Sequence, residues 1–390
     1  MPRTVPPLAV PAAPITAVDY HTAGEPFRIV TGGVPDLEGA DVPARRRHAQ
    51  EHLDHVRALL VNEPRGHADM YGCFVTPPDD EHGDLGVVFF HNAGYSTACG
   101  HGTIALVTWA LDHGVVQARG PHAEVVVDAP SGRLRTVATI DGGAVTSVRF
   151  TNVPSFVEAT DVPVALDDRT LRVDIAFGGA FYAVVAAADV GLAVEPADLP
   201  ALIVLGRRIK AVLETQREVV HPAAEHLRGI YGVIFVDRSA RAPNRMHQRN
   251  VAVFADGEVD RSPTGSGVSA RLALLDAAGG LSRGADLVTT GIAGLEFTGA
   301  SSTMRRSSAG PPSSRRSKAR RTRPAPTSSR STPAIRSARG SSCDDRRAIH
   351  RRRPVAVAVA HERRDRRAGG RVRHRGRRRT ATHPHRCARR

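Results

Sequence analysis

Residues 91–102, which read HNAGYSTACGHG, carry the most informative pattern in this chain. Glycine and other small residues surround Cys99, and the apolar run 103–107 (TIALV) follows at once. This pattern predicts a loop that leads into the N-terminus of a helix, where unpaired backbone N–H groups and the helix dipole favour negative charge. We therefore expect Cys99 to have a lowered pKa and to ionise near neutral pH. A buried, unreactive cysteine is the alternative interpretation.

A second segment repeats this design. Residues 260–270 read DRSPTGSGVSA and open onto the helix-like stretch 271–275 (RLALL). Two loop-to-helix turns that are far apart in sequence can direct both helix N-termini at one small anion. A pair of ordinary capped helices is the alternative for each turn taken alone. Together the two turns predict a carboxylate site.

Two further motifs precede these turns, at residues 19–26 (DYHTAGEP) and 62–70 (NEPRGHADM). The four motifs, in this order along the chain, resemble those of the proline racemase family, and the resemblance covers about Val18 to Gly299. The resemblance implies an α/β fold of two similar barrel-like domains, each around a central helix, as in diaminopimelate epimerase. It also implies an enzyme that works without a metal or an organic cofactor. We place the first domain at residues 1–150 and the second at 151–300.

One position departs from the pattern of the racemases and epimerases in this family. They carry a second cysteine after the Asp-Arg-Ser-Pro run, where this chain has Thr264. Racemisation needs a base on one face of the substrate and an acid on the other, and a threonine hydroxyl does not exchange a proton near neutral pH without strong activation. A threonine here is typical of the branch that dehydrates trans-3-hydroxy-L-proline to 1-pyrroline-2-carboxylate.

That resemblance implies a one-sided reaction. Cys99 would remove the α-proton, and Thr264 would contact the departing hydroxyl or hold a water molecule. Proline racemase and hydroxyproline 2-epimerase remain alternatives within the family.

The resemblance also implies which residues bind the substrate: Gly100, His101, Asp260, Gly265 and Ser266. Backbone N–H groups of the two glycines and of Ser266 would hold the carboxylate, and Asp260 would pair with the ring ammonium. A helix cap or a hydrogen-bonded core histidine is the alternative role for His101, and an N-cap or turn residue is the alternative for Asp260. The motif residues His21, Glu63 and His67 receive no chemistry from their spacing.

The charge of the chain is divided sharply near residue 300. Lys and Arg number 54 in the whole chain against 39 Asp and Glu, and residues 301–390 hold 29 of the former and only 4 of the latter. The first 300 residues are therefore acidic, and they have enough aliphatic content for a sizeable core. The Arg-rich segment 301–390 lacks an apolar pattern and is predicted to be disordered. Non-specific nucleic-acid binding through this tail is the non-enzyme alternative.

The genetic code offers another explanation of the tail. When the codons of residues 327–345 are read two nucleotides later, they can encode EFTLDPRDPLGTGFVLR followed by a stop, which resembles the C-terminus of the family. The same shift changes residues 301–304 to Val-Val-Asp-Asp. We interpret residues 301–390 as the product of a frame slip near Ala300, and expect the proper C-terminus to return strands to the first domain.

Local patterns predict several regular elements. Strands are expected at residues 124–128, 134–140, 146–150 and 171–175, and an amphipathic helix at 200–215. Residues 1–15 lack the features of a signal peptide, and no stretch has the length of a membrane span. Cys73 is expected in the core. Two cysteines before residue 300 do not suggest a disulfide framework, which favours the cytoplasm. A small imino acid is the expected partner, and a homodimer is one open alternative for the assembly.

Overall fold

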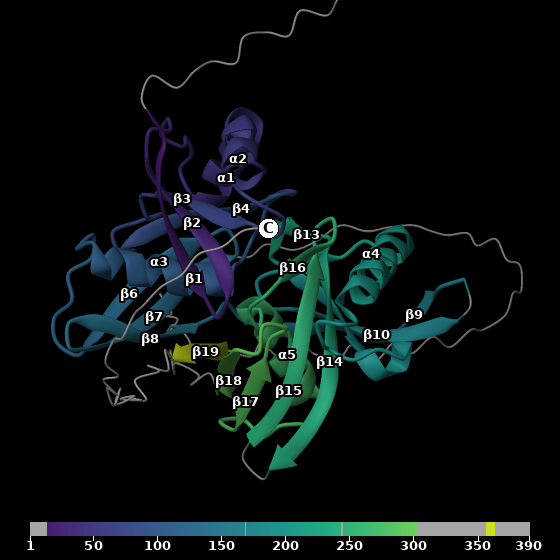
Figure 1. Ribbon diagram of the computed structural model, residues 1–390. Coiled ribbons are helices and arrows are strands. Elements are labelled where there is room, and N and C mark those ends of the chain that lie inside the picture. The colour runs from purple at the N-terminus through teal and green to yellow at the C-terminus, as the bar shows by residue number, and fades with distance from the viewer. Residues whose placement is uncertain (1–13, 168, 243–244, 303–355, 363–390) are drawn as a thin grey trace, which may run out of the picture.

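The computed structural model describes residues 14–167, 169–242, 245–302 and 356–362 (Figure 1). Its strands form one mixed sheet of 17 strands and a separate two-stranded sheet. The large sheet curls into two half-barrels that lie side by side, the first drawn in purple and blue and the second in teal and green (Figure 1). Among the described residues, no helix is both long and apolar enough to cross a membrane.

The first half-barrel curls around helix α3 (Gly100–Asp112). Its strands are β1 (Thr16–Thr22), β2 (Glu25–Gly32), β3 (Tyr71–Thr76), β4 (Leu85–His91), β5 (Gly94–Tyr95), β6 (His122–Ala129), β7 (Gly132–Asp141) and β8 (Ala144–Thr151). Helix α3 contacts β1, β2, β3, β7 and β8. It is apolar on nearly every side, and such a helix is stable only inside a core. Helices α1 (Val42–His52) and α2 (Asp54–Val61) pack against β4.

The second half-barrel curls around helix α5 (Gly265–Ala277) in the same way. Its strands are β9 (Phe156–Ala165), β10 (Thr170–Phe177), β11 (Phe181–Ala186), β14 (Ile230–Ala242), β15 (Arg245–Phe254), β16 (Glu258–Asp260), β17 (Asp286–Thr290) and β18 (Glu296–Ser302). Helix α4 (Leu199–Gln216) covers β14 and β15. The short elements η1 (Ala187–Val190), β12 (Val220–His221) and β13 (Ala224–Arg228) lie in the connection from β11 to β14.

The two halves share one order of strand pairing. In the first half, β2 pairs with β3 in parallel, β3 with β4 antiparallel, and β4 with β6 in parallel across α3. In the second half, β11 pairs with β14 in parallel, β14 with β15 antiparallel, and β15 with β17 in parallel across α5. Each central helix therefore begins at an equivalent point, shortly after a short strand (β5 or β16) that pairs with the preceding long strand. This repeat places the two predicted turns in matching positions.

The structure confirms the expected local elements. The predicted strands correspond to β6, β7, β8 and β10, and the predicted helix corresponds to α4. The domain boundary expected after residue 150 stays a prediction; β8 ends at Thr151 and β9 begins at Phe156. Cys73 lies in β3 and is fully buried in the interior of the first half-barrel.

One part of the Arg-rich tail differs from the predicted disorder. Residues Ala356–Glu362 form strand β19, which pairs antiparallel with β18 on one side and with β8 on the other. Its sequence alternates alanine and valine, a composition that suits a strand. Without β19, the outer edges of β8 and β18 would leave their backbone N–H and C=O groups unpaired. The rest of the tail, residues 303–355 and 363–390, lies outside the described residues, as do most of the codons that the frame-slip interpretation concerns.

Candidate active site

The two loop-to-helix turns meet, as predicted. A Cβ atom on Gly100 would lie 2.6 Å from the Cα of Gly265, and a Cβ on Gly265 would lie 2.9 Å from the Cα of Gly100. Glycine is required on both sides because any side chain would separate the helices. The N-termini of α3 and α5 therefore point into one region between the halves, which is the arrangement a carboxylate site needs.

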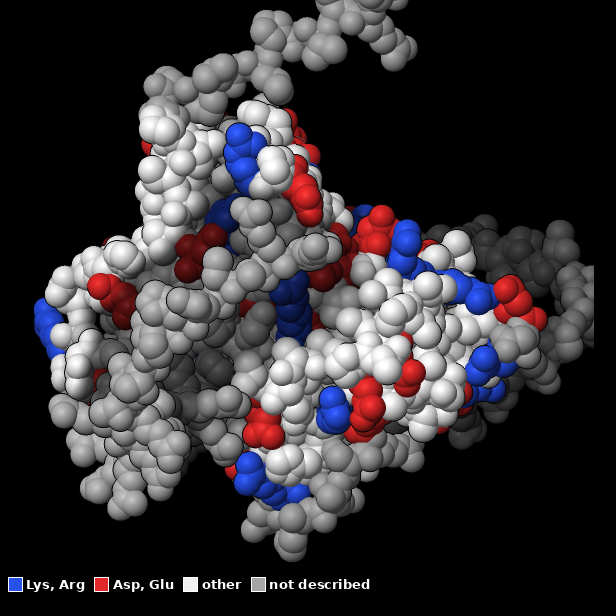
Figure 2. All heavy atoms as spheres, viewed as in Figure 1, with Lys and Arg blue, Asp and Glu red and all other residues white. Residues whose placement is uncertain are grey.

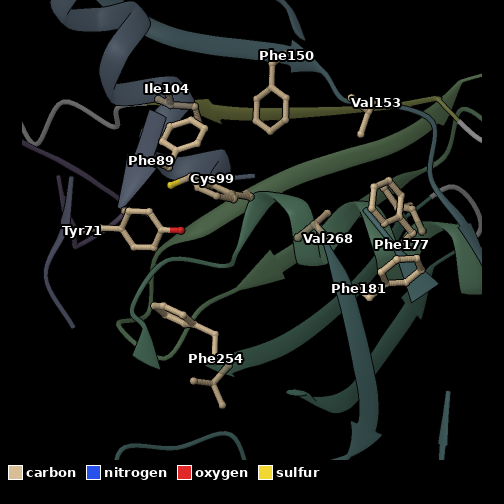
Figure 3. Close-up of a cluster of buried hydrophobic side chains, with 14 of the residues drawn as sticks. Tyr71, Phe89, Cys99, Ile104, Phe150, Val153, Phe177, Phe181, Phe254 and Val268 are labelled. Carbon is tan, nitrogen blue, oxygen red and sulfur yellow. The ribbon is translucent and has the colours of Figure 1, made fainter. Parts of the chain in front are cut away.

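Cys99 is the N-cap residue of α3. Its backbone is extended (φ −151°), and its sulfur accepts a hydrogen bond from the N–H of Gly102 at 3.2 Å. Figure 3 shows Cys99 within a cluster of buried side chains from both halves, close to Phe89 and Tyr71. The helix N-terminus was expected to lower the pKa of this thiol.

That pKa expectation is wrong. Burial raises the pKa of Cys99 well above its ordinary value, and the charge of Asp260 raises it further. The hydrogen bond from Gly102 lowers the pKa, as the prediction required, but it is outweighed. A thiol in a dry site beside a carboxyl group needs another group to accept its proton.

A histidine stands next to that sulfur. The Nε2 atom of His101 lies 3.3 Å from the Sγ of Cys99, and its Nδ1 atom lies 3.5 Å from Oδ2 of Asp260. All three side chains are buried. Asp260 also accepts a hydrogen bond from the N–H of Ser262, which fixes its carboxylate within the turn. The sequence motifs thus assemble into a Cys–His–Asp chain that joins the two halves.

Thr264 is the N-cap residue of α5, the equivalent of Cys99 in the second half, and lines the same cavity. It has φ +61°, a left-handed conformation that is strained for a β-branched residue. Its hydroxyl oxygen is buried and has no hydrogen-bond partner among the described residues. The neighbouring Ser266 has its hydroxyl 2.7 Å from the hydroxyl of Tyr182. An unpartnered buried hydroxyl is costly, so a ligand atom is the natural partner for Thr264.

A small cavity is lined by every predicted site residue except Gly265. Gly265 lies directly against Gly100, which does line the cavity. The sequence analysis missed the remaining lining residues, which are Tyr71, Ala98, Tyr182, Tyr231, Ala252 and Phe254. The hydroxyls of Tyr71 and Tyr231 lie 3.0 Å apart, and the ring of Tyr71 meets that of His101 edge-on at 4.9 Å. Three of the chain's five tyrosines line this one cavity, but their separate positions in the sequence gave no signal of it.

Glu25 is a second residue that the sequence analysis missed. It is completely buried at the start of β2, and its carboxylate accepts a hydrogen bond from the N–H of Arg261 at 2.8 Å. The signal was its place inside the motif 19–26. His21, Glu63 and His67 do not line the cavity. Among the described residues, no group of three or more His, Cys, Asp or Glu side chains could hold a metal ion.

The charged surface of the described residues mixes both signs. Figure 2 shows acidic and basic side chains interspersed over both halves, with a hollow between them. The positive charge that motivated the nucleic-acid alternative belongs to the tail, most of which lies outside the described residues. That alternative stays a prediction.

The two half-barrels bring the N-termini of their central helices together, and a cysteine caps one of these helices. This arrangement defines a class of two-domain α/β enzymes. A solved hydroxyproline epimerase from Agrobacterium vitis, with bound trans-4-hydroxy-L-proline, has this fold: its TM-score is 0.73 at 25% identity, covering 89% of each chain. A probable proline racemase from Agrobacterium radiobacter, with bound carbonate, also gives 0.73 at 25% identity, covering 90% of each chain.

The family model for proline racemase matches residues 17–314. A trans-3-hydroxy-L-proline dehydratase from Bacillus cereus is 48% identical over 284 residues, which cover 73% of this chain and 84% of the relative. A 3-hydroxyproline 2-epimerase from Burkholderia multivorans is 45% identical over 286 residues, covering 73% and 85%. The chain belongs to the proline racemase family, and the predicted fold and family are confirmed.

Proposed function

We propose that the protein dehydrates trans-3-hydroxy-L-proline to 1-pyrroline-2-carboxylate. The observation that carries the proposal is the asymmetry of the paired turns, with a thiol before one helix and a threonine hydroxyl before the other. Only the thiol can take and return a proton near neutral pH. The similarity to dehydratases at 48% identity supports the same substrate.

Proton removal begins with Cys99. Because burial and Asp260 raise the pKa of its thiol, the reactive thiolate forms by passing the proton to His101, whose Nε2 lies 3.3 Å away. Asp260, 3.5 Å from the Nδ1 of the same ring, stabilises the imidazolium. The thiolate then takes the α-proton, and the two helix N-termini stabilise the negative charge that develops on the substrate carboxylate.

The stereochemistry of the substrate lets one residue complete the elimination. In trans-3-hydroxy-L-proline the α-hydrogen and the 3-hydroxyl lie on the same face of the ring. Cys99, protonated when it removes the α-hydrogen, is on the correct side to return that proton to the hydroxyl. The Cα–H and C3–O bonds break, a carbon–carbon double bond forms, and water leaves. The resulting enamine tautomerises to the cyclic imine.

Thr264 then has a supporting role on the opposite face. Of the two roles considered for it, the ring stereochemistry favours holding a water or a ring substituent over contacting the departing hydroxyl. Its partnerless buried oxygen supports such a contact. The backbone N–H groups of Gly100, Gly265 and Ser266 hold the carboxylate in this proposal, and Asp260 also receives the ring ammonium.

The test is direct. Purified protein with trans-3-hydroxy-L-proline should give 1-pyrroline-2-carboxylate, measured by its reaction with o-aminobenzaldehyde. L-Proline in deuterated water should give no D-proline. Rapid formation of D-proline, or of the 2-epimer of a hydroxyproline, would replace the dehydratase proposal by the racemase or epimerase alternative.

A further inference from the structure

Glu25 has the environment of a functional group although it does not line the cavity. Its side chain is 0% exposed at the start of β2. One carboxyl oxygen, Oε2, accepts the hydrogen bond from the N–H of Arg261, and the other, Oε1, is buried without a hydrogen-bond partner among the described residues. A buried carboxyl group with a free oxygen is costly to keep, so it needs an explanation beyond packing.

The hydrogen bond from Arg261 crosses between the two halves of the molecule. A second bond of the same kind lies two residues earlier, where Oδ1 of Asp69 accepts the N–H of Val259 at 2.9 Å. Asp260 lies between these two anchored residues, and its Oδ2 is the atom that faces His101. The first half thus fixes the backbone on both sides of Asp260, and this fixes the Cys–His–Asp chain.

The charge around Glu25 favours its protonated form. Burial raises the pKa of Glu25 well above its ordinary value, and the nearby Asp260 and Asp69 raise it further, whereas Arg261 lowers it. An ionised Glu25 also raises the pKa of Cys99. Negative charge on Glu25 therefore opposes the thiolate, while its hydrogen bond to Arg261 needs only a neutral carbonyl oxygen.

We infer that Glu25 is a positioning residue, which holds Asp260 against His101 through the backbone of Arg261 and does so in its uncharged form. This inference rests on the proposed role of Cys99, Asp260 and His101. Glu25 accepts the hydrogen bond from Arg261. A neutral isostere can also accept this bond, whereas a smaller side chain cannot reach it.

Three variants separate this inference from a simple packing role. Glu25→Gln keeps an acceptor oxygen and should retain kcat within about threefold at neutral pH. Glu25→Ala releases Arg261 and should lower kcat by about 10- to 100-fold with little change in KM, since small displacements of catalytic groups have effects of this size. Asp69→Asn is the matched control for the neighbouring bond. The inference is overturned if Glu25→Gln is as impaired as Glu25→Ala. It is also overturned if Glu25→Ala is as active as the parent. If Glu25→Ala does not fold, Glu25→Asp takes its place in both comparisons.

The charge requirement has a readout that needs no substrate. The rate of alkylation of Cys99 by iodoacetamide is measured against pH, with Cys99→Ser as background. Because the inference makes Glu25 uncharged, Glu25→Gln should leave the midpoint where it is in the parent. Asp69→Asn, the control, should also leave the midpoint in place. A midpoint in Glu25→Gln clearly below that of the parent would refute the inference, because it would reveal a charge on Glu25 that raises the pKa of Cys99. Lack of dehydratase activity in the parent would instead refute the proposed function, and the alkylation result would still stand.

Discussion

The N-termini of α3 and α5 are built alike but are preceded by residues of opposite character. Cys99 has an extended backbone, caps its own helix through Gly102 and touches His101. Thr264 has a left-handed backbone and makes no side-chain cap, and its hydroxyl has no hydrogen-bond partner in the part of the chain that the structure describes. In the proposed function, the first turn therefore carries the proton relay, and the second supplies a helix dipole and a hydroxyl.

In the proposed function, this difference gives a duplicated architecture one-sided chemistry. The paired half-barrels bring two helix N-termini and two glycines together. The side chain at each N-cap then decides how many residues can exchange a proton. The following changes test how far the two turns differ.

The largest effect is expected at the first turn. Cys99→Ser should lower kcat by about 10²- to 10⁴-fold, since a serine hydroxyl cannot act as the general base near neutral pH. Thr264→Ser, the matched change at the second turn, should keep most activity. Both are measured by dehydratase assay on variants with unchanged circular dichroism. Comparable losses at both positions would mean that the turns share the proton transfer.

A second change tests the strands that close the halves. β8 of the first half follows β7 directly, whereas its counterpart β19 arrives from the tail. Val359→Pro removes a backbone donor in the middle of β19 and should cost about 2–4 kcal/mol in the free energy of unfolding. Ala356→Pro, at the first residue of the strand, should cost little. Equal melting temperatures for Val359→Pro and the parent would show that β19 adds nothing to stability.

The contact between the helix ends gives a third test. Gly100→Ala places a Cβ 2.6 Å from the Cα of Gly265, so the helices must separate. The expected cost is about 1–3 kcal/mol, with a raised KM because the carboxylate site widens. Gly280→Ala is the control, since the nearest atom to its Cβ would be the flexible Cδ2 of Leu275 at 3.1 Å, and the Leu275 backbone lies at ordinary van der Waals distance. An unchanged KM in Gly100→Ala would place carboxylate binding elsewhere.

The smallest loss, but the most informative gain, is expected from Thr264→Cys. This change gives the second turn a proton-exchanging group and should introduce proline racemase or hydroxyproline epimerase activity. Dehydratase activity should fall by no more than about tenfold, because Cys99 is untouched. The gain is measured as D-proline formed from L-proline in deuterated water. Absence of any exchange would indicate that position 264 does not face Cα.

The sequence predicted the elements that depend on local pattern. Small residues around Cys99 and Thr264 specify both turns, and alternating β-branched residues specify strands such as β7 and β10. It did not predict the raised pKa of Cys99, because burial and the approach of Asp260 depend on contacts across 161 positions of sequence. The three cavity tyrosines were missed for the same reason, since their isolated positions carry no spacing signal. Glu25 lies inside the motif 19–26, but its contact with Arg261 crosses between the two halves and is not visible in the sequence. β19 was missed because the arginines around it dominate the composition of the tail.

The position of β19 has a consequence for the order of folding. Its partner β18 ends at Ser302, and residues 303–355 separate the two strands, so this pairing closes a long loop and forms after local hairpins such as β6–β7. Until it forms, β8 and β18 each present an open sheet edge. The β19 of a second chain offers the same backbone groups to those edges. Strand exchange between chains therefore competes with self-closure, and concentrated protein should form swapped dimers when refolded quickly.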